Sequence, residues 1–392
     1  MIARRKMEIE EERNKEEERK RREREQFMEK ITETKEMIRV AVGSTRGEED
    51  GQAPRPIYGP GGSSSLAWDN RRDLEVFEGP QKLFYTYHVL GTCCIIPSVN
   101  MARVGNTFTI LNSPTYAKQL NLCDGQRFFN QPVPAFCSGV AVSPFHILTA
   151  GHCFQPRENI NFVFGFQMLR AGGGSGSSAR LVPRLSNYGT SEVFPFGSSA
   201  QITAGSLPES AEDDDDWALV RVADEGNPIP DAFIMPVALS PPAVGEQVLV
   251  TGHPSGLPVK VTTRGNVTRI DRQGGTGVPL TATCDLDTFG GNSGSPIFSA
   301  QFDDGVHGLL ISGETDFVRS ATGDCNVPNY LPSSQAGEKF ILASFIMEEI
   351  RHMNPEAYEQ IRNATQRARA RRAQVNNTIS QSGIPITTTF RD

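Results

Sequence analysis

The sequence of 392 residues contains no run of 18 apolar residues, so it predicts no membrane-spanning helix. Its first residues, MIARRKMEIEEERNK, include no apolar stretch that could act as a secretory signal, and this absence favours the cytosol. The formal net charge of −7 argues against nucleic acid as the main partner. We therefore expect neither a membrane nor a nucleic acid among the partners of this chain.

Metal-binding cysteine spacing is also missing. The seven cysteines include no CxxC pair, and the adjacent Cys93 and Cys94 are poorly placed to share one ion. The cysteine spacing therefore predicts no metal site, and no cofactor is expected. Because seven is an odd number, at least one cysteine stays unpaired within the chain.

Residues 1–40 form a charged arm in which residues 10–26 have no apolar side chain. Four pairs place an acidic residue four positions before a basic one: Glu11/Lys15, Glu16/Lys20, Glu17/Arg21 and Glu18/Arg22. In a helix, each such pair contributes about 0.2–0.5 kcal/mol of stability. The apolar seam of a coiled coil is missing in the middle of the arm. Two interpretations stay open: a solvated helix or tail, and a charged helix that docks a protein partner.

Composition divides the rest of the chain into three parts. Residues 41–67 are rich in Gly, Pro and Ser and are typical of a linker. Residues 68–335 contain short apolar runs, such as FCSGVAVS and EQVLVTG, separated by turn residues, which indicates an all-β barrel or sandwich. Residues 336–392 are expected to form helices and a tail.

Two helices are predicted in this last part. One covers residues 338–351, and the second begins at Asn354-Pro355, a capping residue followed by proline. The second helix runs into the basic stretch QRARARRAQ. This stretch is either a solvated helix end that complements the helix dipole or a site for an anionic partner.

Three motifs of the β region carry reactive side chains. In DTFGGNSGSP, residues 287–296, small residues surround Ser293, as is needed where backbone N–H groups face outward beside an exposed hydroxyl. In TAGHC, His152 follows an apolar strand and a tight Ala-Gly turn. In EDDDDWALVRV, Asp216 directly precedes an apolar strand, where a partly buried carboxylate needs a partner such as a histidine N–H. A nucleophilic hydroxyl needs a base, and the base needs an orienting carboxylate. Residues 213–215 are interpreted as a solvated acidic loop or a cation site.

In the order His, Asp, Ser, the motifs TAGHC, DWALV and GGNSGSP resemble those of chymotrypsin-like (PA clan) serine peptidases, most closely the trypsin-like/V8-like bacterial branch. The resemblance covers about residues 68–330 and includes the stretches GHPSGLPVKV and GLLISGETDF. It implies an all-β fold of two antiparallel six-stranded barrels, at about 80–225 and 230–335, with helical N- and C-terminal extensions outside them. It also suggests an exported protein, in contrast to the missing signal.

The resemblance also implies the roles of individual residues. Ser293 matches the nucleophile, His152 the general base and acid, and Asp216 the carboxylate that orients the imidazole, while the N–H groups of Gly291 and Ser293 match the oxyanion hole. Cys137 and Cys153 match a disulfide that braces the histidine turn, the alternative being two reduced thiols. A second disulfide is expected between Cys284 and Cys325.

Two positions bear on activation and specificity. Asn292 stands where zymogen-derived relatives have an aspartate, so activation by a freed amino terminus is not expected. Asp287, six residues before Ser293, matches the base of the S1 pocket and predicts a preference for basic P1 residues. The alternative is that backbone N–H groups hold Asp287 in a structural role. Further residues expected near the S1 pocket are Thr288, Leu310, Ile311, Ser312 and Gly313, with Glu314 as another acid.

The sequence thus predicts a serine endopeptidase that cleaves a protein or peptide substrate through an acyl-enzyme. The α/β-hydrolase alternative fails because residue 295 is serine where the G-x-S-x-G elbow needs glycine, and because the order of the three residues differs. Two alternatives stay open. One is an inert peptidase-like scaffold or binding protein, and the other is a peptidase restricted to its own chain or to a polyprotein.

Overall fold

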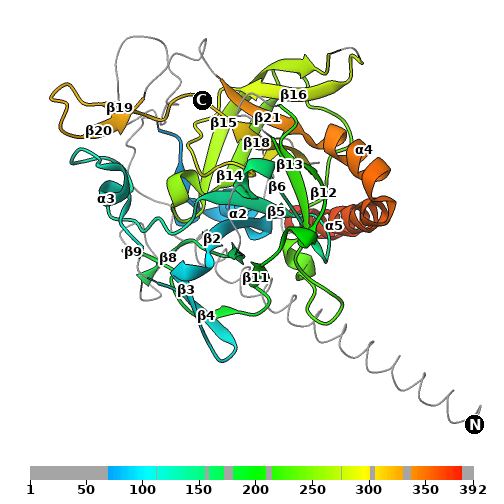
Figure 1. Ribbon diagram of the computed structural model, residues 1–392, viewed down its shortest axis with the longest axis horizontal. Helices are drawn as coiled ribbons and strands as arrows, with labels where there is room; N and C mark the ends of the chain where they lie inside the picture. The colour runs from blue at the N-terminus through cyan, green and yellow to red at the C-terminus, as the bar shows by residue number, and fades with distance from the viewer. Residues whose placement is uncertain are drawn as a thin grey trace, which may run out of the picture. The chain divides into compact units, whose positions relative to one another are not determined.

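The computed structural model describes residues 69–381, except residues 112 and 275 and the segments 155–158, 172–179, 209–213, 301–304 and 330–336. All described residues belong to one of two compact units, residues 53–392. The predicted arm at 1–40 and the linker at 41–67 lie outside the described residues. Strands are the commonest regular elements of this unit, and its longer helices lie near its two ends in sequence (Figure 1). No helix in the described ranges has the length and apolarity needed to cross a membrane.

Six antiparallel strands close into a barrel in the second half of the unit. In order around the barrel they are β15 (Lys260–Arg272), β14 (Gln247–Gly252), β17 (Pro296–Ser299), β18 (Val306–Ser312), β21 (Glu338–Leu342) and β16 (Pro279–Cys284). β16 pairs again with β15 and closes the ring, so its strands have no free edge. The short strand β1 (Arg72–Asp73) adds to the outside of β15.

The first half of the unit is a curled sheet of seven strands. Their order is β11 (Val193–Phe196), β7 (Ile160–Phe164), β2 (Thr92–Pro97), β5 (Cys137–Ala141), β6 (His146–Thr149), β13 (Trp217–Arg221) and β12 (Ile202–Ser206). In the part of the chain that the structure describes, β11 and β12 are the two edges, so this sheet is a half-barrel rather than the closed six-stranded barrel that was expected. The predicted chymotrypsin-like, mostly β fold is otherwise confirmed.

Smaller elements surround the two sheets. One small sheet contains β3 (Met101–Val104), β4 (Thr107–Ile110) and β10 (Tyr188–Gly189), and two hairpins contain β8 (Met168–Arg170) with β9 (Leu181–Pro183) and β19 (Phe317–Arg319) with β20 (Asn326–Pro328). The short 3₁₀ turns are Leu74–Val76, Ser98–Asn100, Gly151–Phe154, Ser199–Gln201, Asp231–Phe233 and Pro254–Gly256.

The helices differ from the expectation in two places. The sequence did not predict α2 (Gly79–Gly91) or the short α3 (Tyr116–Leu120). The helix expected over 338–351 begins only at Ala343, as α4 (Ala343–Met353). Residues 338–342 are instead strand β21, which pairs on both sides and completes the second barrel. The segment forms a strand despite its helical sequence pattern because it pairs with β16 on one side and β18 on the other. Such tertiary pairing overrides local helix propensity.

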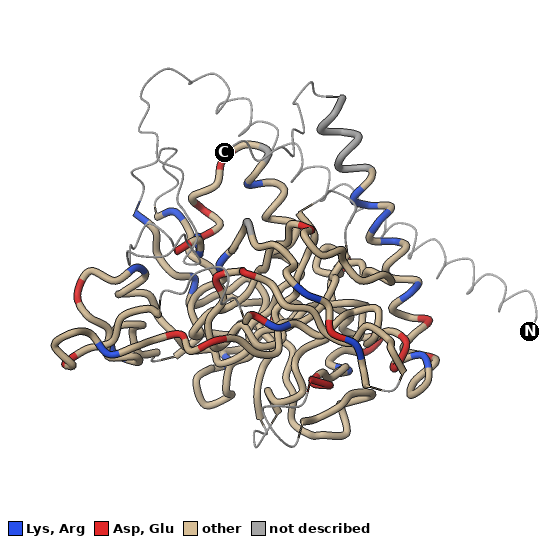
Figure 2. Tube along the Cα trace, turned by 90° about the horizontal axis from the view of Figure 1, so that it is seen from above, with Lys and Arg blue, Asp and Glu red and all other residues tan. Residues whose placement is uncertain are grey.

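The predicted start of the last helix is confirmed. α5 (Pro355–Gln381) follows Asn354, whose Oδ1 accepts the Ala357 N–H at 3.1 Å as a helix cap. α4 packs on both β18 and β12, so the C-terminal region contacts both sheets. The basic residues of α5 follow one another between Arg362 and Arg372, in the middle of the helix (Figure 2). They are not simply solvated, because Arg369 and Arg371 donate to backbone carbonyls of the segment between the sheets.

Candidate active site

His152 and Asp216 are brought together by two paired strands. His152 lies in the 3₁₀ turn that follows β6, and Asp216 directly precedes β13. β6 and β13 are antiparallel, with Thr149 opposite Ala218, so the end of one strand meets the start of the other. The turn requires glycine at Gly151, since a Cβ there would lie 2.4 Å from the Ser206 carbonyl oxygen.

Asp216 holds His152 through both carboxylate oxygens. The Oδ2 atom lies 2.6 Å from Nδ1 of the ring, and Oδ1 accepts the backbone N–H of His152 at 2.9 Å. The Asp216 side chain is 5% exposed and the His152 side chain 38%. A buried carboxylate is thereby satisfied, while the imidazole stays reachable from solvent. This arrangement fixes the ring so that Nε2 faces away from Asp216.

The neighbouring acidic residues have partners of their own. Asp214 forms an ion pair with Lys339 at 2.6 Å, and Oδ1 of Asp215 accepts the Trp217 indole N–H at 2.9 Å. These contacts differ from the expected solvated loop, and they attach the start of β13 to the second barrel through Lys339 of β21. Residue 213 lies outside the described residues.

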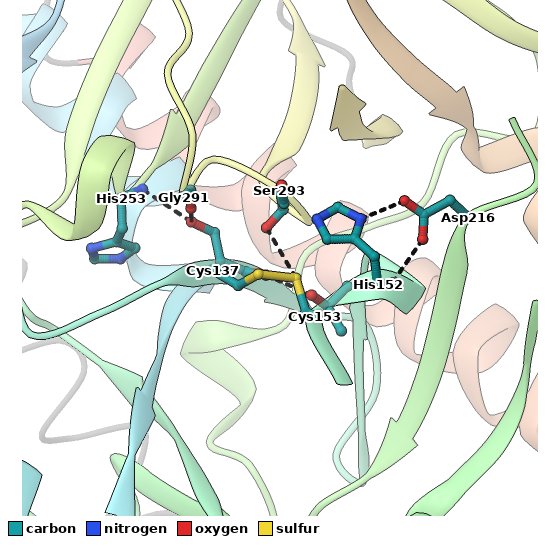
Figure 3. Close-up of a disulfide and its surroundings, with 9 residues drawn as sticks. Cys137, His152, Cys153, Asp216, His253, Gly291 and Ser293 are labelled. Atoms are coloured by element: carbon teal, nitrogen blue, oxygen red, sulfur yellow. Dashed lines mark hydrogen bonds and ion pairs between the residues drawn. A yellow bond between two sulfur atoms is a disulfide. The ribbon is translucent and has the colours of Figure 1, made fainter. Parts of the chain in front are cut away.

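Ser293 comes from the second barrel and reaches the first sheet. The loop between β16 and β17 carries it, and its carbonyl oxygen accepts the Ser138 N–H from β5 at 2.9 Å. Close approach requires glycine at Gly294, because a Cβ there would lie 2.3 Å from the Ser138 carbonyl oxygen. Figure 3 shows Ser293 beside the His152 ring, on the side facing away from Asp216. Within the described ranges, the Ser293 hydroxyl forms no hydrogen bond with His152; such bonds often shorten only when substrate binds.

Two backbone N–H groups of this loop are left without an acceptor. Among described residues, the N–H groups of Gly291 and Ser293 donate no hydrogen bond. Their neighbours all do: Gly290 donates to Asp316 Oδ2, Asn292 to Phe289 O, Gly294 to Leu310 O and Ser295 to Asn292 O. Gly291 also has φ of +92°, a conformation that favours glycine. The loop thus has the two outward donors that an oxyanion hole requires.

One predicted disulfide is confirmed and the other is wrong. Cys137 and Cys153 are bonded and connect β5 to the residue after His152 (Figure 3). Cys325 pairs with Cys123 across 202 residues, not with Cys284. Cys284 is fully buried in β16, whereas the hairpin that carries Cys325 pairs with the chain beside Cys123. Burial raises the pKa of the Cys284 thiol, so this free cysteine is poorly reactive.

The described residues offer one group of side chains close enough to share a metal ion, Cys137, His152 and Cys153. Two of the three are joined in the disulfide, so their thiolates are not present as ligands.

The residues expected near the S1 pocket fall into two sets. Asp287 is buried and accepts the Asn70 backbone N–H at 2.8 Å, as the structural interpretation of this residue requires. Thr288 donates its hydroxyl to the carboxylate of Glu338, which is 3% exposed. Leu310 and Ile311 are buried, whereas Ser312 and Gly313 are exposed.

The sequence did not single out Glu338, because its segment was interpreted as a helix. Glu338 is part of β21, and its carboxylate lies so close to Gly313 that a Cβ added there would be 2.2 Å from it. The same carboxylate accepts the Glu314 N–H at 3.4 Å. Glu338 therefore contacts three of the residues that the sequence placed near the S1 pocket, and only the strand assignment could have identified it.

Comparisons with known proteins found a matching family and similar solved structures. Residues 137–304, which include His152, Asp216 and Ser293, match the family of the trypsin-like peptidase domain. The Rv3671c protease from M. tuberculosis in its active form is 13% identical, with a TM-score of 0.35 over 69% of this chain and 83% of that one. The HtrA-type protease AlgW with a decapeptide is 16% identical, with a TM-score of 0.37 over 69% of this chain and 66% of that one. Among curated proteins, none matches significantly. Over residues 137–304 the chain is thus similar to the trypsin-like peptidase domain.

Proposed function

We propose that the protein is a serine endopeptidase that hydrolyses peptide bonds with His152, Asp216 and Ser293 as its catalytic triad. The observation that carries this proposal is the double contact between Asp216 and His152, with Nδ1 bound at 2.6 Å and the ring held beside Ser293. A carboxylate that orients an imidazole next to a serine is the arrangement that activates a hydroxyl for acyl transfer.

In the proposed reaction, Ser293 Oγ attacks the carbonyl carbon of the scissile peptide and His152 Nε2 accepts its proton. The oxyanion forms opposite the N–H groups of Gly291 and Ser293, which have no other acceptor among the described residues. His152 then donates its proton to the leaving amine, and the acyl group stays on Ser293 until water, deprotonated by the same imidazole, releases it. Asp216 stays ionised and keeps the proton of the ring on Nδ1.

Activation of the proposed enzyme does not require a new amino terminus. Asn292 is buried and neutral, and its Oδ1 accepts the Ser295 hydroxyl at 3.2 Å. A neutral side chain in this position cannot form an ion pair with a freed amino group. The chain is therefore proposed to be active without cleavage in its linker.

The preference for basic P1 residues stays a prediction. Asp287 is 2% exposed and is occupied by the Asn70 N–H, which favours the structural interpretation of its role. A cleavage profile decides between the two interpretations, because an S1 pocket with an acidic base selects Arg and Lys whatever the protein substrate.

The experiment is a peptide-library cleavage profile of the wild type beside Ser293→Ala, with and without a thiol reductant. Cleavage that disappears in Ser293→Ala supports the triad, and cleavage after Arg or Lys further supports Asp287 as the S1 acid. Equal cleavage by both proteins would contradict the proposal. Cleavage by neither would favour the scaffold interpretation or a peptidase restricted to its own chain or to a polyprotein.

A further inference from the structure

Two segments outside the proposed triad hold the loop before Ser293. From the segment that precedes β1, the Asn70 N–H donates to Asp287, and the Arg71 guanidinium stacks on the Phe289 ring, 3.6 Å from its centroid. From the segment between β18 and β19, Asp316 Oδ2 accepts the Gly290 N–H at 2.6 Å. Gly290 is the residue directly before Gly291, whose N–H is the proposed oxyanion donor.

The orientation of that donor depends on the peptide between Gly290 and Gly291. The Gly290 carbonyl oxygen accepts the Ser255 N–H at 2.5 Å. In a trans peptide the C=O and N–H groups point in opposite directions, so this bond turns the Gly291 N–H away from Ser255. Both backbone groups of Gly290 are thus held, one by Asp316 and the other by Ser255. Two consecutive glycines would otherwise let this peptide rotate at low cost.

We propose that Asp316 is a positioning residue of the peptidase, which holds the Gly291 N–H in the oxyanion hole by accepting the Gly290 N–H. The inference rests on the proposed function, since it concerns the same site. Asp316 does not touch the reacting atoms in this role, and it acts only through the peptide backbone.

The negative charge of Asp316 does not stabilise the fold. Burial raises the pKa of its carboxyl to about 6, although the Gly290 N–H and the Arg71 charge both lower it. Arg71 is the charged group from the neighbouring segment that acts on Asp316, and it is itself paired with Asp69 at 2.8 Å; Glu314 lies two residues away on the same segment. Keeping this carboxylate charged above pH 6 therefore costs stability, as is common for groups retained for function.

The hairpin that follows Asp316 is attached on both sides. Phe317 packs on Phe289 with ring centroids 5.4 Å apart, and the Asp316 carbonyl oxygen accepts the Asn329 N–H at 2.8 Å. The disulfide from Cys325 to Cys123 ties the hairpin to the first half of the unit. Asp316 is thus fixed relative to the loop that it supports.

The test compares Asp316→Ala and Asp316→Asn with the matched control Asp324→Asn, which changes an exposed aspartate in the turn of the same hairpin. Asp316→Ala should lower kcat by about 10- to 100-fold while KM changes little, because the oxyanion donor contributes mainly in the transition state. Asp316→Asn should recover most of this loss, because its amide oxygen can still accept the Gly290 N–H. Asp324→Asn should behave as the wild type.

Two further readouts separate positioning from a structural role. The midpoint of urea unfolding at pH 8 should not fall in Asp316→Asn, since an isosteric amide removes a costly buried charge. As pH falls through 6, the carboxylate of the wild type becomes protonated and accepts the Gly290 N–H more weakly. The wild type should therefore lose kcat in this range more steeply than Asp316→Asn.

A wild-type kcat in Asp316→Ala would overturn the inference and leave the proposed function intact. If the wild type cleaves no peptide, the proposed function fails, and hydrogen exchange then tests the inference on its own. Exchange of the Gly290 N–H should be faster in Asp316→Ala than in Asp324→Asn, and equal exchange in the two variants would overturn the positioning role of Asp316.

Discussion

Asp216 binds His152 at two points, the ring Nδ1 at 2.6 Å and the backbone N–H at 2.9 Å. The backbone contact fixes the position of the 3₁₀ turn, and the ring contact fixes the tautomer. The carboxylate thus sets both the place and the protonation pattern of the imidazole.

The substitution Asp216→Asn separates these two contributions. The amide oxygen of the new side chain can still accept the backbone N–H, but its NH₂ group would favour the wrong tautomer of His152. We expect kcat to fall by about 10⁴-fold with a nearly unchanged unfolding midpoint. Steady-state kinetics and urea unfolding provide the two measurements. A variant with wild-type kcat would show that Asp216 does not orient the base.

Gly291 should tolerate no side chain. A Cβ at this position would lie 2.8 Å from the His253 carbonyl oxygen, and φ of +92° disfavours other residues. We expect Gly291→Ala to lower kcat by at least about 100-fold, because the proposed oxyanion donor is displaced. Gly274→Ala is the matched control, since a Cβ there meets nothing within 4 Å. Similar kinetics for the two alanine variants would argue against a role of the Gly291 N–H.

Three buried histidines should make the fold sensitive to acid. Burial lowers the pKa of His88 and of His253 to about 3, and that of His146 to about 4. An unfolded histidine titrates near 6.5, so below this pH the unfolded state binds more protons and the free energy of unfolding falls. Between pH 7 and pH 5 each of these histidines should lower it by up to about 2 kcal/mol. Urea unfolding at the two pH values measures the sum.

One variant isolates a single histidine. His88 lies between the rings of Phe84 and Phe298, with centroid distances of 4.6 and 4.5 Å. His88→Phe should therefore fold and should lose about a third of the pH dependence. Asp316 has the opposite effect on the free energy of unfolding. Because its pKa is raised in the folded protein, the folded state binds more protons at this residue between pH 4 and 6 than the unfolded state does. A pH dependence unchanged in His88→Phe would contradict the assignment.

The disulfide between Cys123 and Cys325 should stabilise the fold. It closes a loop of 202 residues, and its loss should lower the free energy of unfolding by about 2–4 kcal/mol. The double variant Cys123→Ala/Cys325→Ala, compared with the wild type in urea, measures this value. Reductant should lower the stability of the wild type and leave the double variant less affected. An equal effect of reductant on both proteins would assign the stabilisation to the Cys137–Cys153 disulfide instead.

Local patterns were sufficient for some features of this protein. The short apolar runs indicated a β fold, and the cap Asn354 marked the start of α5. His152, Asp216 and Ser293 could each be named because a reactive side chain at the end of a strand or in a glycine-rich turn has a recognisable local context. The Cys137–Cys153 pair was expected from the resemblance, and it spans only 16 residues.

Tertiary structure alone decided the features that depend on contacts between distant segments. Strand β21 has a helical pattern, yet two open strand edges made it the sixth strand of the barrel and brought Glu338 beside Thr288. Cys325 found Cys123 rather than Cys284 because two chain segments meet there. Asp316 reaches Gly290 across 26 residues. No local signal marks such pairs, because their free energy comes from hydrogen bonds and packing that exist only when the barrel is closed.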